Sequence, residues 1–305
     1  MFLQHVADGI LSGAIISLGA IGLTLTMRIL RFANFAHSEL LTWGAYSALV
    51  FVGFFMAMDE LLGGALGGSI GPLSFGWTLV VAAVLAGGLT AAVALLLDRL
   101  VFARLRGHAG HMTLVFASFG VALLVRNVIL MGFGPDPFYY SNELQIAVRV
   151  GAVRVMPDQV FVLGLTAGLV VVLHFFMTRS RTGVHMRAVA ENPSLARASG
   201  VDVDAIVRWT WIIGASGAAV AGVLYGLTVQ LRPELGFSLI LPLFAAAILG
   251  GTGSLYGAVI GGLVVGLSEN LSVMVIPSSY KPAVPFLLIL AVLYFRPQGL
   301  FGEPR

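Results

Sequence analysis

Long apolar runs separated by short polar segments dominate the chain. A helix needs about 20 residues to span the roughly 30 Å hydrocarbon core of a bilayer. Backbone inside lipid must satisfy its own hydrogen bonds, so these runs predict membrane helices rather than open strands. One uncharged run, residues 235–268, is much too long for a single straight crossing. The pattern predicts about eight membrane segments, at residues 9–27, 40–58, 77–97, 112–131, 159–177, 209–231, 235–268 and 283–295.

Composition supports an all-α polytopic membrane protein. The 305 residues are 58% hydrophobic and 10% charged, with a mean hydropathy of +0.98, whereas a soluble domain carries roughly 25% charged residues. The 38 glycines suit helices that approach one another closely in lipid. The chain has no cysteine, which excludes disulfides, thiolate metal sites and cysteine nucleophiles. The first residues, MFLQHVADG, lack a basic stretch and a cleavage site, so no cleaved signal peptide is expected.

The distribution of arginine predicts the orientation. Short cytoplasmic loops of membrane proteins carry an excess of Lys and Arg, and three such loops lie on one side if every run crosses once. The N-terminus is then outside. The tail ends outside if residues 235–268 cross once and inside if they cross twice. The three basic segments contain Arg28 and Arg31, then Arg99, Arg104 and Arg106, then Arg179, Arg181, Arg187, Arg197 and Arg208.

The loop at residues 132–158 argues against this orientation, because it would lie outside and yet contains Arg149 and Arg154. Its apolar residues alternate on both sides of Gly151-Ala152. Such alternation about a glycine predicts a small β-hairpin that turns there.

The longest polar run, residues 179–208, contains a complete short helix signal. Asn192 suits the N-cap, Pro193 the first helical position and Gly200 the left-handed stop. A helix of two turns is unstable in water by itself. It therefore needs a surface to lie on, and it is the part of the chain that could contact a soluble partner. A solvated loop with a frayed turn is the alternative.

Two stretches interrupt the helix pattern. The first brings Asn34, His37 and Glu39 to the start of an apolar run; helix capping at the interface is the alternative to a functional role. The second, GGTGS at residues 250–254, indicates a break between half-helices whose freed N–H groups face a water-filled path; close helix packing is the alternative. One break in each half of the chain is typical of transporters.

Catalytic chemistry is missing from the sequence. It contains no GxxxxGK[ST], HExxH or GxSxG motif and no metal-ligand spacing. No basic patch indicates nucleic-acid binding. A gradient-driven carrier usually carries intramembrane acids, and only Glu39 and Glu269 qualify weakly. These observations favour a permease driven by a partner over a gradient-driven carrier or a membrane-embedded enzyme.

Four stretches together resemble one family, the permease subunits of bacterial branched-chain amino-acid ABC importers, and the shorter (H-type) subunit in particular. They occur in the family's order and cover most of the chain. They are GLTLTMRILRFANFAHSELLTWGAY (22–46), MRAVAENPSLARASGVDVD (186–204), FAAAILGGTGSLYGAVIGGLVVGLSE (244–269) and YFRPQGLFG (294–302).

The resemblance implies an ABC importer permease fold, with residues 1–305 as one transmembrane domain and 179–208 as a cytoplasmic coupling loop. It implies a multi-pass protein of the bacterial inner membrane, paired with a homologous second permease, two cytoplasmic ABC ATPases and a periplasmic substrate-binding protein. The cargo would be branched-chain or other hydrophobic amino acids; urea or short amides are the alternative. This chain would bind no cofactor or metal, since the partner ATPases use ATP and Mg²⁺. The implied ATPase-coupling residues are Glu191, Asn192, Pro193, Ala196, Arg197 and Gly200, and the implied path residues are Asn34, His37, Glu39, Gly250, Gly251, Gly253 and Ser254.

Overall fold

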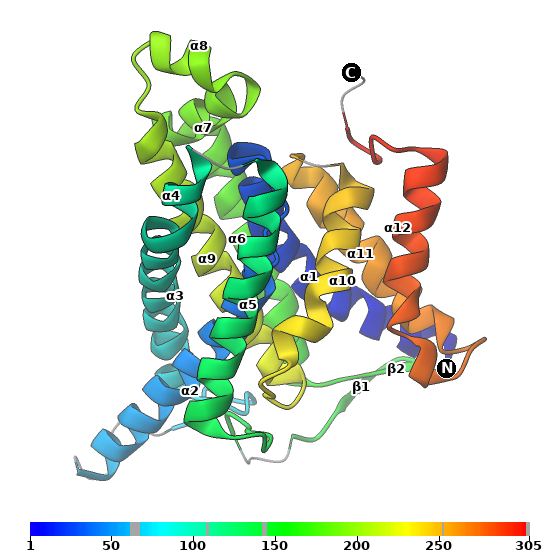
Figure 1. Cartoon of the computed structure of the whole chain (residues 1–305). Helices are drawn as coiled ribbons and strands as arrows, with labels where there is room; N and C mark the ends of the chain where they lie inside the picture. The colour runs from blue at the N-terminus through cyan, green and yellow to red at the C-terminus, as the bar shows by residue number, and fades with distance from the viewer. Residues whose placement is uncertain (62–67, 108–109, 142–144, 252, 303–305) are drawn as a thin grey trace.

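A bundle of long helices makes up the computed structural model (Figure 1). The structure describes residues 1–61, 68–107, 110–141, 145–251 and 253–302. A two-stranded sheet is the exception to the helical architecture. The helices are α1 (Phe2–Leu30), α2 (Ala36–Leu61), α3 (Trp77–Leu97), which continues through a π-helical turn (Asp98–Phe102) into α4 (Ala103–Arg106), α5 (His111–Phe133), α6 (Pro157–Arg179), α7 (Arg181–Glu191), α8 (Pro193–Ala198), α9 (Val203–Thr228), α10 (Leu235–Gly250), α11 (Leu255–Ser272), a 3₁₀ turn (Ser278–Tyr280) and α12 (Ala283–Phe295).

Seven of the described helices are long and apolar enough to cross a membrane, and α10 and α12 are shorter apolar helices. The over-long run at residues 235–268 divides into α10 and α11. These two helices pack against each other in antiparallel fashion, since a Cβ at Gly250 would lie 2.1 Å from the carbonyl oxygen of Gly257 and one at Gly261 would lie 2.2 Å from that of Ala246. The run therefore makes two traversals of the bundle.

The interruption at residues 250–254 differs from the expected break between half-helices at membrane depth. It is the turn between α10 and α11, and it lies at the same end of the bundle as the last turn of α1, where Arg28 donates to the carbonyl of Gly253. Gly251 and Gly253 have φ values of 98° and 104°, which favour glycine. Here the glycines reverse the chain instead of interrupting a helix within the bilayer.

α1 is the most buried of the spanning helices and packs closely on α11 (Figure 1). A Cβ at Gly266 would lie 2.3 Å from the backbone nitrogen of Gly13, and one at Gly13 would lie 2.8 Å from the Cα of Leu263. The hydroxyl of Ser17 donates to the carbonyl of Val259 at 2.8 Å. Small residues permit this approach in lipid, and we call this α1–α11 contact the glycine seam.

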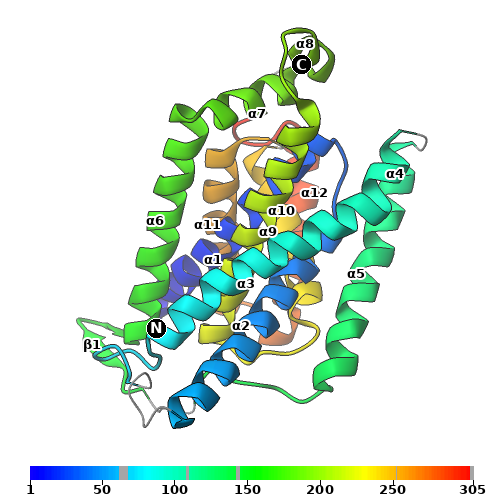
Figure 2. The ribbon, with the colours of Figure 1, turned by 90° about the vertical axis from the view of Figure 1, so that its left-hand side faces the viewer.

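Different elements lie at the two ends of the bundle (Figure 2). α4, α7, α8 and the C-terminal tail lie at one end, called here the Arg-rich end, and the tail residue Arg296 joins it. The positive-inside rule assigns this end to the cytoplasm. The described part of the tail, up to Gly302, thus lies on the side expected from two crossings by residues 235–268; Arg305 lies outside the described residues. The other end carries the predicted hairpin, β1 (Val148–Val150) and β2 (Val153–Val155), which turns at Gly151-Ala152 with Arg149 opposite Arg154.

Candidate coupling segment and polar path

α8 forms as the sequence predicts. The side-chain oxygen of Asn192 accepts from the backbone N–H groups of Ser194 (3.1 Å) and Leu195 (3.0 Å), and Pro193 occupies the first turn. Gly200 follows with φ of 84°, and the N–H of Val201 donates to the carbonyl of Ala196 at 3.0 Å. Local capping chemistry therefore sets both ends of this six-residue helix.

α7 and α8 together cover the Arg-rich end, and we call residues 180–200 the coupling segment. The Ser180 hydroxyl caps α7 by accepting from the N–H of Gly183 at 2.9 Å. A Cβ at Gly183 would lie 2.5 Å from two carbonyls of α6, so glycine permits the sharp turn. Within α8, the side chain of Ala196 is buried against the rest of the protein, whereas Leu195 is 65% exposed. α8 lies at the end of the bundle (Figures 1 and 2), so this large exposed apolar side chain is presented beyond the membrane helices.

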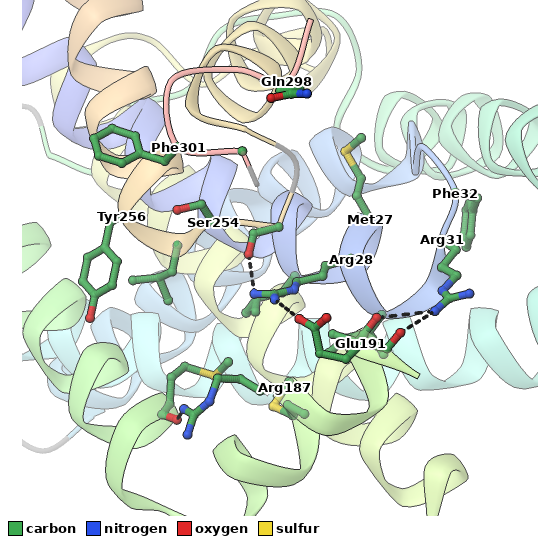
Figure 3. Close-up of a pocket in the computed structure, with 18 of the residues that line it drawn as sticks. Met27, Arg28, Arg31, Phe32, Arg187, Glu191, Ser254, Tyr256, Gln298 and Phe301 are labelled. Atoms are coloured by element: carbon green, nitrogen blue, oxygen red, sulfur yellow. Dashed lines mark hydrogen bonds and ion pairs between the residues drawn. The ribbon is translucent and has the colours of Figure 1, made fainter. Parts of the chain in front are cut away.

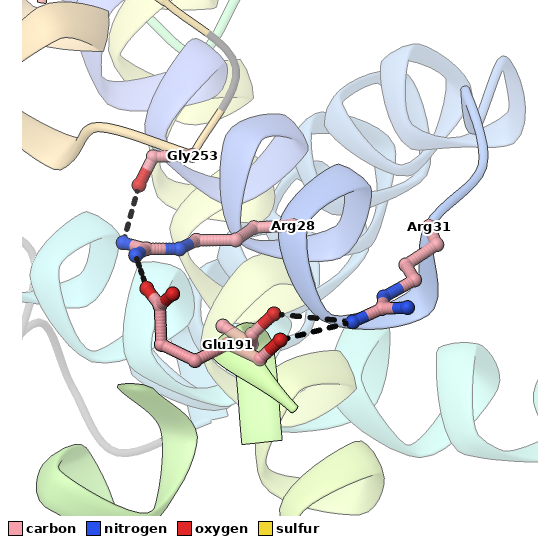
Figure 4. A network of polar contacts seen from close by, with 5 residues as sticks. Arg28, Arg31, Glu191 and Gly253 are labelled. Carbon is pink, nitrogen blue, oxygen red and sulfur yellow. Dashed lines mark hydrogen bonds and ion pairs between the residues drawn. The ribbon is translucent and has the colours of Figure 1, made fainter. Parts of the chain in front are cut away.

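Glu191 ends α7, and its side chain reaches the last turn of α1. Its carboxylate accepts from Nη2 of Arg28 at 2.9 Å, and Nη1 of the same guanidinium donates to the carbonyl oxygen of Gly253 at 2.8 Å (Figure 4). One arginine of α1 therefore holds both the coupling segment and the α10–α11 turn.

Arg31 contacts the same corner from the other side. Its Nη2 lies 3.4 Å from the carbonyl oxygen of Ala190 and 3.3 Å from that of Glu191 (Figure 4). Its φ of 60° makes it the one described non-glycine residue with a left-handed backbone. The backbone N–H of Arg31 donates to the carbonyl oxygen of Met27, and this hydrogen bond closes the last turn of α1.

A cavity of about 1170 Å³ opens at this end (Figure 3). Its walls come from the end of α1, from α6 and α7, from the start of α11 and from the C-terminal tail. Basic side chains outnumber acidic ones in its lining, which includes Arg28, Arg31, Arg187, His111, His174 and Glu191.

The predicted path residues Asn34, His37 and Glu39 are 1% exposed or less. Oδ1 of Asn34 accepts from the N–H of Ala36 at 3.2 Å, the capping interaction foreseen as the alternative. Nε2 of His37 lies 3.1 Å from the carbonyl oxygen of Gly19. Nδ2 of Asn34 and Nδ1 of His37 are buried without a hydrogen-bond partner. Helix capping therefore explains the burial of Asn34 Oδ1 but not that of Asn34 Nδ2 and His37 Nδ1.

A polar connection runs from Glu39 to α10. The Thr42 hydroxyl donates to the Glu39 carboxylate at 3.4 Å and accepts from the backbone N–H of Gly236 at 2.7 Å. Arg126 of α5 also acts electrostatically on the Glu39 carboxylate. Arg126 also lies 5.2 Å over the ring of Phe237. A charged group within the membrane-spanning part of a bundle faces the protein interior or a water-filled space.

The glycines of the second predicted path stretch have separate roles. Gly253 and Ser254 line the cavity at the Arg-rich end. Gly250 packs against Gly257, and Gly251 packs against Gly302 of the tail. The structure therefore does not bring all four together around one space.

A second cavity of about 760 Å³ lies at the opposite end, between the end of α9, the start of α10 and the loop at Tyr140. The hydroxyl of Tyr140 donates to the carbonyl of Ala45 at 2.9 Å. Burial raises the pKa of this phenol well above its usual value. The polar residues of its lining include Tyr139, Arg232, Glu234 and Ser238.

Several of these contacts have no local sequence signal. Arg28 and Arg31 serve as orientation signals in the sequence, and nothing there pairs Arg28 with a residue 163 positions away. Thr42 and Gly236 look like ordinary members of apolar runs. Among the described residues, no cluster of three His, Asp or Glu side chains could hold a metal ion.

Comparison with known proteins identifies the family. Residues 5–293 match the family described as "Branched-chain amino acid transport system / permease component". The chain is 30% identical to the high-affinity branched-chain amino acid transport system permease protein LivH of Escherichia coli K12, over all of this chain and 96% of that one. It is also 30% identical to BraD of Pseudomonas aeruginosa, over 100% and 97%, and 29% identical to a probable LivH of Methanocaldococcus jannaschii, over 96% and 92%. The chain thus belongs to the branched-chain amino acid transport permease family and is the multi-pass membrane component of an ABC importer, not an enzyme.

Proposed function

We propose that this chain pairs with a homologous second permease subunit, and that the pair carries branched-chain or other hydrophobic amino acids across the inner membrane. A permease of an ABC importer works with ATPase and binding-protein partners. In the proposed assembly two ABC ATPases bind the cytoplasmic end, and a periplasmic binding protein delivers the cargo to the other. Full-length similarity to permeases named for branched-chain amino acids supports this cargo.

In this proposal α8 docks on an ATPase. The exposed, capped α8 with Leu195 at its surface carries the proposal, because it offers an apolar contact beyond the membrane helices and a helix this short gains stability from a surface to lie on. Asn192, Pro193, Ala196 and Gly200 set the shape of the helix, and Arg197 flanks the apolar contact.

The test is co-purification of the ATPases from the native host. Leu195→Asp should abolish or strongly reduce ATPase binding while the permease still inserts in the membrane. Ile146→Asp is the matched control, since Ile146 is 87% exposed and precedes the hairpin at the opposite end. Retention of both ATPases by Leu195→Asp would refute docking through α8.

We further infer that the translocation path follows the start of α2. Polar residues of this stretch lie between residues that line the two cavities: Asn34 follows Ala33, which lines the first, and Gly236, bonded to Thr42, follows Leu235, which lines the second. His37 and Glu39 lie between them, with Gly250 and Gly251 beside the cytoplasmic mouth that Gly253 and Ser254 line. Because the chain lacks cysteine, single cysteines at positions 34, 39 and 42 can be probed with a thiol reagent. They should become accessible during ATP turnover and stay protected at rest; protection throughout would exclude this path.

Transport assays on the purified complex in liposomes decide the cargo and the energy source. Uptake of leucine, isoleucine and valine should require ATP and the binding protein. Uptake by the permease alone under an ion gradient would instead support a gradient-driven carrier. Uptake of urea or acetamide in place of the amino acids would correct the substrate class.

A further inference from the structure

We propose that Arg28, Glu191 and the carbonyl of Gly253 form a joint that transmits movement of the coupling segment to α1, α10 and α11, and that Glu191 acts inside the permease and does not contact the ATPase. This inference depends on the proposed docking of α8. It assigns to Arg28, Arg31 and Glu191 a positioning role in coupling.

The joint connects three elements that are far apart in the sequence. The guanidinium of Arg28, in the last turn of α1, bonds Glu191 across 163 residues and Gly253 across 225 residues (Figure 4). Glu191 is the last residue of α7, and Asn192 both ends α7 and caps α8. The carboxylate therefore sits at the corner where a displacement of α8 enters the membrane domain.

The elements on the membrane side of the joint are stiff. The glycine seam fixes α1 to α11 through backbone contacts that leave no room for a side chain. The tail closes over the end of α10, since the N–H groups of Leu300 and Phe301 donate to the carbonyls of Leu249 (2.8 Å) and Gly250 (3.1 Å). Close-packed elements transmit displacement instead of absorbing it. A pull on Arg28 would thus move α1, α10 and α11 together.

Arg31, the left-handed C-cap of α1, adds a second contact from the end of α1 to the end of α7. A left-handed backbone at a non-glycine residue costs about 1 kcal/mol or more and persists only where its surroundings impose it. Here the conformation directs the guanidinium to the carbonyls of Ala190 and Glu191, the last two residues of α7. Glycine at this position would relieve the backbone but lose the contact.

A simple surface ion pair is the competing explanation. The side chains of Arg28 and Glu191 are 34% and 66% exposed, and exposed pairs contribute little to stability. That weakness makes the joint testable, because removing it should leave folding intact. Any effect on coupling is then separable from misfolding.

The experiment is a double-mutant cycle on the complete complex with its ATPases and binding protein, reconstituted in liposomes. Arg28→Met, Glu191→Gln and the double variant are compared by the amount of radiolabelled leucine taken up per ATP hydrolysed. Each single variant should lower this ratio by about fivefold or more, the lower range of typical coupling effects. The double variant should be no worse than Arg28→Met alone, because Glu191→Gln affects only a bond that Arg28→Met has already removed.

Two controls complete the design. Arg208→Met breaks an exposed pair with Asp202 (3.8 Å) near the coupling segment and should leave the ratio unchanged. Gly253→Ala, which would place a Cβ 2.8 Å from Cδ of Arg28 on a left-handed backbone, should lower the ratio as Arg28→Met does. ATPase co-purification and the thermal midpoint should stay at wild-type levels in Arg28→Met and Glu191→Gln.

The outcomes separate this inference from the docking proposal. A wild-type ratio in either single variant, or effects that multiply in the double variant, would overturn the joint. Loss of the ATPases from Glu191→Gln would also overturn it, because Glu191 would then be a docking contact. If Leu195→Asp still retains the ATPases, only the proposal that α8 docks on them is refuted. The double-mutant cycle on Arg28 and Glu191 measures a separate quantity, the leucine taken up per ATP, and can be interpreted whatever that result.

Discussion

The hydroxyl of Thr42 accepts a hydrogen bond from the backbone N–H of Gly236 at 2.7 Å, and this contact ties α2 to the first turn of α10. A Cβ at Gly236 would lie 2.3 Å from the carbonyl oxygen of Ser38, so glycine is what lets the two helices come so close. The N–H at the start of α10 has no partner within its own helix. A side chain of a neighbouring helix satisfies it here.

Thr42→Val should therefore destabilise the protein. Valine keeps the shape but leaves the Gly236 N–H buried and unpaired, which costs about 1–3 kcal/mol. Thermal unfolding in detergent measures the change. Thr228→Val is the control, since its hydroxyl bonds the Tyr225 carbonyl, which the N–H of Val229 also satisfies. Equal effects of the two substitutions would contradict the assigned role of Thr42.

The glycine seam predicts opposite effects for two similar substitutions. Gly→Ala in an open helix position stabilises by roughly 0.5–1 kcal/mol, and Gly168 of α6 has open space around it. Gly266→Ala instead forces a methyl group to within 2.3 Å of the backbone of Gly13. Overpacking of this kind costs about 1–3 kcal/mol. Gly266→Ala should lower the thermal midpoint and Gly168→Ala should not; a tolerated Gly266→Ala would mean that the helices separate easily.

Tyr140 predicts a pH dependence of stability. Burial holds its pKa well above the ordinary value of about 10. Above pH 10 the unfolded chain releases this proton and the folded chain keeps it, so stability falls as pH rises. Tyr140→Phe should be less stable than wild type below pH 10 by roughly 0.5–1.5 kcal/mol, and the difference should shrink toward pH 11. Thermal midpoints of both proteins from pH 8 to 11 measure it; a constant difference would show that the phenol titrates normally.

Asp158 holds the loop that contains Ser74 in place, and its substitution should loosen that loop. Its buried carboxylate accepts from the N–H of Ser74 (3.0 Å), from the Ser74 hydroxyl (2.5 Å) and from Nε2 of Gln145 (2.7 Å). Asp158→Asn presents an amide N–H to donors, and loss of bonds to a charged acceptor costs about 1.5–3 kcal/mol. Amide hydrogen exchange should accelerate in residues 68–76, while the exposed Asp136→Asn leaves it unchanged. Wild-type protection in Asp158→Asn would show that other contacts order this loop.

The sequence predicted those elements that are determined by interactions between residues close together in the chain. Asn192, Pro193 and Gly200 specify α8 by capping, and alternation about Gly151 specifies the hairpin. The run lengths predicted the spanning helices, but α2 begins at Ala36, ahead of the expected residue 40. Its polar first turn is buried in protein and never meets lipid.

Features that depend on tertiary contact could not be predicted. The run at residues 235–268 has no charge to mark depth, so the sequence leaves open whether its glycines interrupt a helix or turn at a surface. The pairing of Glu191 with Arg28 depends on how α7 folds back on α6, where Gly183 packs against two carbonyls and Arg187 bonds the carbonyl of Met177. The left-handed backbone of Arg31 has no signal in the residue type.

The glycine seam also constrains how the protein is made. α1 is made before α11: the surface it packs on, at Gly262 and Gly266, is translated about 250 residues later, a delay of roughly 10–50 s at bacterial elongation rates. During that interval its small-residue face has only lipid or an insertion factor to cover it. Nascent chains that stop before α11 should therefore carry an unfinished first helix and be the preferred targets of membrane quality-control proteases.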